Sequence, residues 1–119
     1  ILLGVQKNDT ENDAEFLVNK ICGLRIFNDE NDKMNLSIKD VNGSALVISQ
    51  FTLCGDTKKG RRPSFIKAAT PDDGNRLYEY FISEMKKDGV PIESGEFGAI
   101  MDVELVNNGP VTFVLNSKD

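Results

Sequence analysis

The sequence contains no histidine, and this absence excludes more chemistry than any other property of the composition. Without imidazole the protein has no Ser-His or Cys-His nucleophile pair, no histidine metal ligand and no histidine general base. Tryptophan is absent as well. An enzyme made of these residues must move protons with carboxylates, lysine, tyrosine, water or the substrate itself.

Cysteine is scarce, and long apolar runs are missing. Cys22 and Cys54 lie far apart and without a metal-type spacing, so we expect two reduced thiols in a cytoplasmic protein. No apolar run approaches the ~18 residues of a membrane-spanning helix, so no membrane partner is expected. The opening ILLGV has neither a basic flank nor a cleavage site, which argues against a signal peptide. With no linker and no repeat, residues 1–119 are expected to form one domain.

The net charge of −5 argues weakly against a nucleic-acid partner, but the charge is unevenly distributed. The stretch KKGRRPSFIK has no acidic residue, and its cations are Lys58, Lys59, Arg61, Arg62 and Lys67. A basic loop on an acidic protein indicates one local anionic contact and not a general coating of DNA. From charge alone, a solvated loop without a partner is as good an interpretation.

Two helices are predicted. Residues 7–24 carry an apolar stripe after a capping-box pattern, Thr10 with Asp13, and Gly23 is predicted to end the helix. Residues 70–89 begin with Thr70 as N-cap and proline in the first turn, and two lysines precede a closing glycine. The buried stripe of this second helix is predicted to be Leu77, Phe81 and Met85.

Strands are predicted at residues 1–6, 24–27, 44–53, 97–107 and 111–116. Residues 44–53 are apolar throughout their first half, which is typical of a central strand. Residues 97–107 alternate apolar and polar side chains. The last two strands would form a hairpin around Asn-Gly, although Pro110 has no N–H for the first pair. The pattern is that of an α+β fold, with two helices packed on a sheet.

Several polar side chains are candidates for chemistry, and each has a structural alternative. Ser49 and Thr52 place hydroxyls at the end of the central strand, where bonding to nearby backbone is the commoner role. Cys54 is a conceivable nucleophile, but no base that would activate it is identifiable. Asp102 and Glu104 are two residues apart on one strand face, and a solvated face explains them better than a paired site.

Two apolar side chains stand four residues apart near the end of the chain, Phe97 and Met101. They could line a pocket for a base, while packing in the core is the default role for these residue types. The residues alone thus indicate a soluble α+β domain with a local anion site.

Four motifs occur in a fixed order along the chain: ISQFTL at 48–53, GRRPSF at 60–65, GEFGAIM at 95–101 and NNGPVTF at 107–113. Together they closely resemble the D-aminoacyl-tRNA deacylase (D-tyrosyl-tRNA deacylase) family. The first helix with LRIF, and KMNLS at 33–37, match the same family, so the resemblance covers essentially the whole chain. Members of the family begin with further strands ahead of the ILLGV segment, and these N-terminal strands are missing here.

The resemblance implies a homodimer of small β-barrel-like α+β subunits that needs no cofactor and no metal. The reaction would be hydrolysis of the ester between a D-amino acid and the 3′-terminal adenosine of tRNA, with release of both. Glycine mischarged on tRNA-Ala is expected to be removed as well. Such an enzyme would serve chiral proofreading and translation quality control in the cytoplasm.

Selectivity in the family implies a role for Gly109 and Pro110, as a Gly-cisPro pair presented to the active site of the opposite subunit. The pair would reject an L side chain by steric clash and unpaired polar groups, and would not grip the D side chain better. A Cβ at Gly109 would crowd that approach.

The strand end formed by Ser49, Gln50, Phe51 and Thr52 is implied to be catalytic. Its backbone N–H groups would form an oxyanion hole, and the 2′-OH of the adenosine would help to activate water. Thr52 is the traditional nucleophile candidate, but no nearby residue type in the sequence is a good base for it.

Two further contacts with tRNA are implied. Phe97 and Met101 would hold the adenine, and phosphates of the acceptor stem would be held by Lys58, Lys59, Arg61 and Arg62. Two other interpretations stay open: a module that binds RNA 3′ ends without turnover, and a fragment that folds only together with the missing strands.

Overall fold

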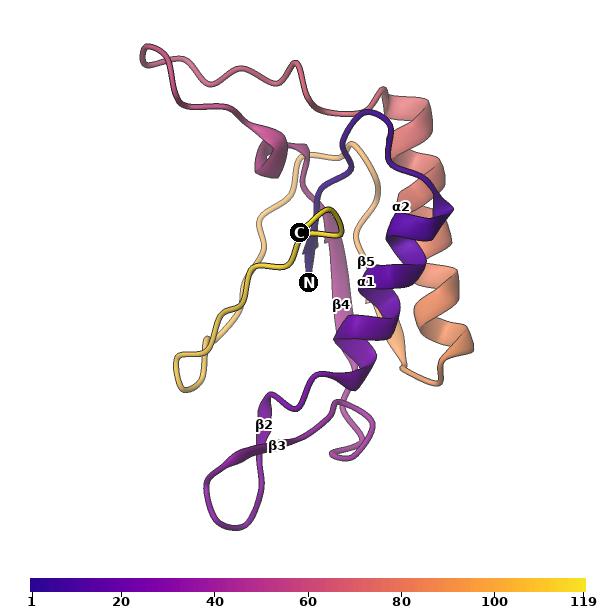
Figure 1. Cartoon of the computed structure of the whole chain (residues 1–119), viewed down its shortest axis with the longest axis vertical. Helices are drawn as coiled ribbons and strands as arrows, with labels where there is room; N and C mark the ends of the chain where they lie inside the picture. Colours follow the sequence, from indigo (N-terminus) through magenta and orange to yellow (C-terminus); the bar gives the residue numbers. More distant parts are fainter.

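The computed structural model describes all residues from Ile1 to Asp119. Its elements follow in the order β1 (Leu2–Leu3), α1 (Glu11–Gly23), β2 (Phe27–Asn28), β3 (Met34–Leu36), β4 (Ala45–Ser49), the 3-10 turn η1 (Phe51–Cys54), α2 (Pro71–Lys87) and β5 (Ile92–Ser94). Two helices and two small sheets give the α+β class that the sequence predicts (Figure 1). No helix is both long enough and apolar enough to cross a membrane.

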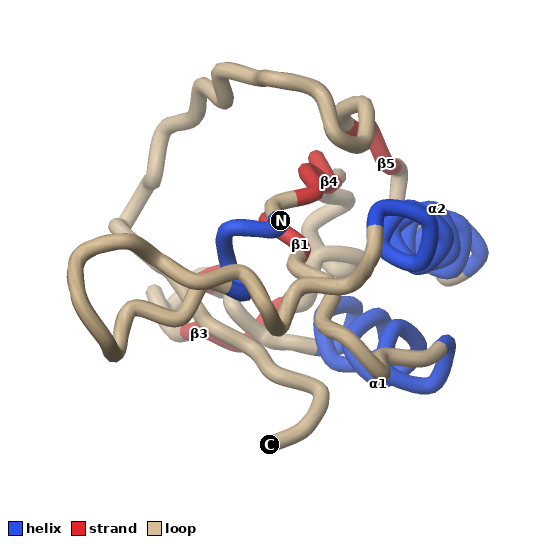
Figure 2. Tube along the Cα trace, turned by 90° about the horizontal axis from the view of Figure 1, so that it is seen from above, coloured by secondary structure: helices blue, strands red, loops and turns tan.

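The larger sheet has the strand order β1-β4-β5, with both neighbours parallel to β4. The central position predicted for residues 44–53 is therefore confirmed for Ala45–Ser49. Seen from above, α1 and α2 lie on the same side of this sheet (Figure 2). The smaller sheet is an antiparallel ribbon of β2 and β3.

Both predicted helices form, and local signals set where they begin. The Thr70 hydroxyl accepts the backbone N–H of Asp73 at 3.3 Å, and Pro71 occupies the first turn. The Asp13 carboxylate accepts the backbone N–H of Thr10 at 2.8 Å, so the first helix starts at Glu11 and not at residue 7.

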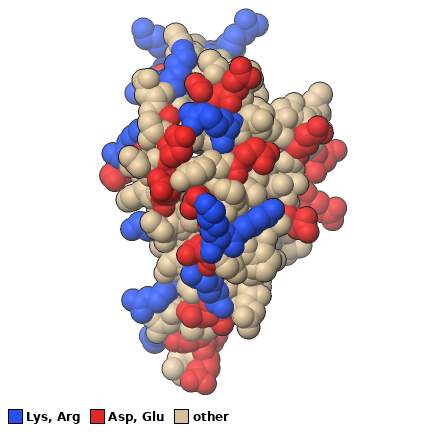
Figure 3. Space-filling model, turned by 90° about the vertical axis from the view of Figure 1, so that its right-hand side faces the viewer, with Lys and Arg blue, Asp and Glu red and all other residues tan.

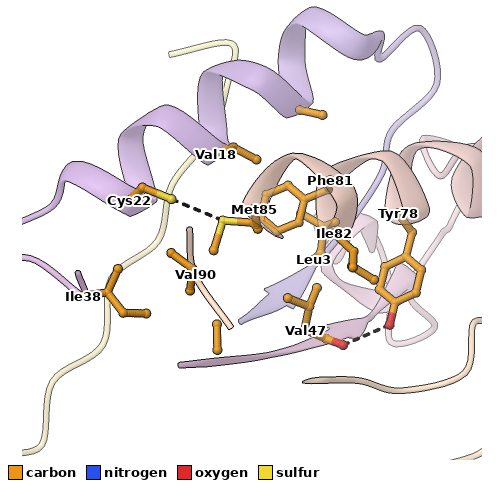
Figure 4. Close-up of a cluster of buried hydrophobic side chains, with 12 residues drawn as sticks. Leu3, Val18, Cys22, Ile38, Val47, Tyr78, Phe81, Ile82, Met85 and Val90 are labelled. Carbon is orange, nitrogen blue, oxygen red and sulfur yellow. Dashed lines mark hydrogen bonds between the residues drawn. The ribbon is translucent and has the colours of Figure 1, made fainter. Parts of the chain in front are cut away.

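The core lies between the two helices and the sheet (Figure 4). Its buried members are Leu3, Ala14, Val18, Cys22, Ile38, Ala45, Val47, Tyr78, Phe81, Ile82, Met85 and Val90. The buried stripe predicted for the second helix is confirmed, since Leu77, Phe81 and Met85 are all buried. Acidic and basic side chains are interspersed over the helical face, and basic side chains project at the upper end of the molecule (Figure 3).

Three predicted strands differ from their predicted bounds. The strand predicted at 24–27 overlaps β2 only at Phe27. The strand predicted at 44–53 ends at Ser49, because the chain turns into η1 directly after Gln50. The buried strand predicted at 1–6 is reduced to Leu2–Leu3, of which only Leu3 is buried. Strands β3 and β5 were not predicted.

The hairpin predicted from strands at 97–107 and 111–116 is wrong. Residues 101–115 run out and back without any strand assignment, and none of their backbone groups pairs with another backbone group (Figure 1). Pro110 has no N–H for the first hydrogen bond of a ladder. The next N–H, of Val111, donates to the Asn107 side-chain oxygen at 2.9 Å instead. Without a partner strand the alternating apolar side chains stay in solvent: Ile100, Val106 and Val114 are at least 91% exposed.

Candidate active site

The strand end that the sequence singles out lies where β4 leaves the sheet. Gln50 makes the last ladder contact, donating its backbone N–H to the Leu3 carbonyl at 2.8 Å. The chain then enters η1 and places Phe51 and Thr52 at the surface, while Ser49 and Gln50 stay half-buried. A central strand thereby delivers four consecutive residues to one edge of the sheet.

Two adjacent backbone amides at this edge donate to nothing in the chain. The first residues of a 3-10 turn have no acceptor within the turn. Consistent with this, the N–H groups of Phe51 and Thr52 make no hydrogen bond, whereas the next N–H, of Leu53, donates to the Gln50 carbonyl at 3.2 Å. Two free, neighbouring donors are the elements of an oxyanion hole.

The Thr52 hydroxyl has no base beside it. Its only hydrogen-bond partner is the Gln50 side-chain amide, which donates to Thr52 Oγ1 at 3.0 Å. Because this partner is a donor, nothing beside Thr52 can take the hydroxyl proton, so the geometry does not activate Thr52 as a nucleophile.

Cys54 is equally unsuited to be a nucleophile. It is buried, and its thiol lies 3.5 Å from the Val5 carbonyl. Burial raises the pKa of the Cys54 thiol and so disfavours the reactive thiolate. Asp102 and Glu104 are exposed and form no ion pair or hydrogen bond with another side chain.

Phe97 and Met101 lie beside the same strand end, both half-buried. The Phe97 ring is 5.8 Å from the ring of Tyr78, centroid to centroid. Met101 and the Ile48 side chain flank Gly95 so closely that a Cβ there would fall 2.6 Å from the Met101 sulfur. Since Ile48 directly precedes Ser49, the structure brings the predicted base pocket next to the predicted catalytic edge.

Three supporting residues of this pocket escaped the sequence prediction: Gly74, Tyr78 and Gly95. A Cβ on Gly74 would approach the Phe97 ring to 3.0 Å, so this helical glycine makes room for the ring. The buried Tyr78 hydroxyl lies 2.9 Å from the Val47 carbonyl and 2.6 Å from that of Gly95, joining β4 to the segment that carries Phe97 (Figure 4). The apolar stripe of the helix was the available signal for Tyr78, but it indicated only burial.

The basic loop lies next to η1. Its root is closed by two backbone hydrogen bonds, Asp56 N–H to Ser64 O at 2.7 Å and the reverse at 2.9 Å. The Lys58 backbone N–H lowers the pKa of the Asp56 carboxyl, whose second partner is the Lys67 ammonium at 3.8 Å. The other four cations of the loop, Lys58, Lys59, Arg61 and Arg62, form no ion pair within the chain.

Gly109 and Pro110 are joined by a cis peptide bond. Asn107 closes the turn around them, accepting the Val111 N–H at 2.9 Å and donating to the Thr112 hydroxyl at 2.9 Å. The turn lies at the outer end of the 101–115 segment, away from the strand end in the same chain (Figure 1). One copy of the chain therefore does not bring Gly109 and Pro110 together with residues 49–52.

A separate hollow of the molecule lies elsewhere. A mostly apolar groove of about 600 Å³ runs between α1, β1 and residues 111–117. None of the predicted site residues lines it. No group of three or more carboxylate or thiol side chains is placed so that it could hold a metal ion.

The structure is an α+β domain with free strand-end amides, an adjoining pair of half-buried apolar side chains and a basic loop. Residues 1–116 match the sequence profile of the family described as D-Tyr-tRNA(Tyr) deacylase. The chain belongs to this family of D-aminoacyl-tRNA deacylases, which are hydrolases.

Individual relatives support the assignment. The chain is 56% identical to the D-aminoacyl-tRNA deacylase of Thermosipho melanesiensis, covering 99% of this chain and 79% of the relative. It is 57% identical to that of Bacillus cytotoxicus, over 99% and 81% of the two chains. A solved structure titled "c-Myc DNA Unwinding Element Binding Protein" superposes with a TM-score of 0.86 at 38% identity, over 92% of this chain and 75% of the other.

A second solved structure shares the fold at much lower identity. It is described as a probable eukaryotic D-amino acid tRNA deacylase and superposes with a TM-score of 0.65. The identity is 16%, over 81% of this chain and 71% of the other.

Proposed function

We propose that this protein hydrolyses the ester bond between a D-amino acid and the 3′-terminal adenosine of tRNA, as chiral proofreading during translation. The observation that carries the proposal is the pair of free backbone amides of Phe51 and Thr52 beside the half-buried Phe97 and Met101. Membership of a deacylase family supplies the bond that such a site would cleave.

In the proposed reaction, water attacks the ester carbonyl carbon and negative charge develops on its oxygen. The amides of Phe51 and Thr52 donate to that oxygen, which stabilises the tetrahedral intermediate. The 2′-OH of the adenosine assists the water, because the chain has no histidine and no base lies beside Thr52. The intermediate collapses to the free amino acid, and the departing 3′-oxygen of the adenosine takes up a proton.

Rejection of the L enantiomer is assigned to Gly109 and Pro110 of a partner subunit in a homodimer. Their turn is exposed and lies away from the strand end of its own chain, which favours action on a second copy (Figure 1). Exclusion of an L side chain leaves glycine free to enter, since glycine has no side chain to clash. We therefore propose that glycine mischarged on tRNA-Ala is hydrolysed too.

The remaining contacts position the tRNA. Phe97 and Met101 would hold the adenine, whose π-face tolerates apolar partners. The four unpaired cations of the basic loop would contact acceptor-stem phosphates, which fix register and not sequence.

The test is release of free D-tyrosine from D-Tyr-tRNA by the full-length protein, with L-Tyr-tRNA as the control substrate. We expect turnover of the D form and little of the L form. Thr52→Ala should reduce the D rate by less than about tenfold, because it removes one hydroxyl and keeps the backbone donor. Tight binding of the charged tRNA without release would identify a binding module instead. A Thr52→Ala loss of several orders of magnitude, with intact tRNA binding, would make Thr52 the nucleophile.

A further inference from the structure

Beside the catalytic edge, the aromatic rings of Phe51 and Phe65 form a pair that the proposed reaction does not use. Their centroids are 5.0 Å apart with an interplanar angle of 63°. Phe51 belongs to η1, and Phe65 directly follows the closed root of the basic loop. The backbone pairing of Asp56 with Ser64 thus brings together two rings from two of the family motifs.

Packing alone does not account for this pair. One edge of Phe65 fits against Gly55, where a Cβ would lie 3.0 Å from the ring. Phe51, however, is 60% exposed, and neither ring belongs to the core cluster. A ring left this open forgoes most of the stabilisation that burial of phenylalanine provides.

The surroundings of the pair indicate the chemistry of its partner. On one side lie the free amides of Phe51 and Thr52, on the strand end where Ile48 and Met101 flank Gly95. On the other side stands the basic loop, with four cations that no acid of this chain neutralises. Exposed aromatic rings next to unpaired cations are the composition of a surface for single-stranded nucleic acid.

We propose that the Phe51–Phe65 pair stacks the base of the nucleotide that precedes the terminal adenosine. This inference rests on the proposed function, because the adenosine must first occupy the Phe97 and Met101 pocket. A strand that runs from Phe97 and Met101 to the basic loop passes the two rings, since Phe51 stands on η1 and Phe65 at the root of the loop. Stacking tolerates any base, so the pair adds affinity for the 3′ end without sequence selection.

The first test compares two substrates of the full-length protein: D-Tyr-tRNA and D-tyrosyl adenosine, which lacks every preceding nucleotide. Phe65→Leu should lower kcat/KM for D-Tyr-tRNA by ~10-fold more than for D-tyrosyl adenosine, mainly through KM. The matched control is Phe27→Leu, because Phe27 is 36% exposed against 38% for Phe65 and lies on the β2–β3 ribbon. The control should change both substrates equally little.

The second test alters the tRNA: it removes the base of the penultimate nucleotide and compares wild-type protein with Phe65→Leu. D-Tyr-tRNA with an abasic penultimate nucleotide should lose about the same factor with wild-type protein, and Phe65→Leu should add no further loss on it. Equal losses on tRNA and on D-tyrosyl adenosine, or normal turnover of the abasic tRNA, would overturn the proposal. So would a change of oligomeric state in Phe65→Leu by sedimentation, which would make the pair an interface between copies.

Failure of the proposed function gives a different result. If wild-type protein hydrolyses neither substrate, the deacylase proposal fails, and stacking is then judged from the Kd of uncharged tRNA. A Kd that rises ~10-fold on removal of the penultimate base, and rises no further with Phe65→Leu, supports the stacking surface. An unchanged Kd refutes it.

Discussion

At the scale of single residues, the proposed chemistry depends on backbone groups. Phe51 and Thr52 would contribute their backbone amides. Their side chains take no part in the proposed hydrolysis. Backbone donors suit a chain without histidine, because an oxyanion hole needs no titratable group. The expected consequence is that side-chain truncation at this edge matters less than loss of an N–H.

Phe51→Pro compared with Phe51→Ala isolates that N–H. Both variants lack the ring, but only proline lacks the amide proton, and proline is tolerated at the first position of a helical turn. Gln50 has φ −144° and ψ 91°, an extended conformation that a following proline accepts. On D-tyrosyl adenosine, Phe51→Pro should be roughly 100- to 1,000-fold slower in kcat than Phe51→Ala. Equal rates for the two variants would rule out the Phe51 amide as an oxyanion donor.

Asn107 is the residue that holds the turn at Gly109 and Pro110. Its side chain makes both polar contacts that cross the turn, to the Val111 N–H and the Thr112 hydroxyl. Asn107→Ala should loosen the turn and lower the D/L ratio of kcat/KM by about tenfold or more, through faster L hydrolysis. Asn108→Ala is the matched control, since the neighbouring asparagine forms no such bond. An unchanged D/L ratio of kcat/KM in Asn107→Ala would show that the turn does not select between the enantiomers.

At the scale of elements, we assign separate roles to β4 and the basic loop: β4 positions the proposed catalytic edge, and the loop binds tRNA phosphates. Strand β4 and its two parallel neighbours hold the proposed catalytic edge in place through the sheet ladder. The backbone pairing of Asp56 with Ser64 closes the root of the loop, and the four cations beyond the root form no ion pair, so they are free to meet phosphates. Loss of loop charge should therefore affect tRNA affinity and leave the chemistry of the edge in place.

Lys58→Ala combined with Arg62→Ala tests this division. The slope of log Kd against log salt for tRNA should flatten by roughly 0.7–0.9 for each phosphate that the variant no longer neutralises. The control is Lys86→Ala combined with Lys87→Ala, which removes equal charge from the far end of α2. A slope that changes equally in both pairs would mean that only net charge is sensed.

At the scale of the whole molecule, the C-terminal tail is tied to the first helix. The Lys118 ammonium lies 2.8 Å from one Asp13 oxygen and 3.5 Å from Asp9. This hydrogen bond from Lys118, followed by that from the Thr10 N–H, lowers the pKa of Asp13 to about 2. The tail thereby closes one side of the groove between α1 and residues 111–117.

The ion pair gives stability a defined pH dependence. Because the pKa of Asp13 is lower in the folded state than its ordinary value of about 3.9, the stabilisation is complete above pH ~4 and disappears as the pH falls through about 2. Lys118→Gln should lower Tm by a few degrees at pH 7, as expected of a partly exposed pair, and by much less at pH 2, where Asp13 is half protonated in the folded state. Lys86→Gln is the control that should show no such pH dependence. A Lys118→Gln effect on Tm that is as large at pH 2 as at pH 7 would have another origin.

The sequence by itself determined the features that depend on local signals. Both helices, their caps and the stripe of Leu77, Phe81 and Met85 follow from signals that act within one or two turns. The central position of β4 follows from its apolar run, and the membership of the deacylase family follows from four ordered motifs.

Only the tertiary structure decided which residues far apart in the sequence contact one another. The segment 97–116 has strand-like alternation, but a strand exists only where another strand pairs with it, and no pattern within the segment states whether one will. The same holds for the site. Nothing local places Gly74 and Tyr78 behind Phe97, Met101 beside Ile48, or Phe51 against Phe65, because these contacts form only when the helix and the loops close over the end of β4.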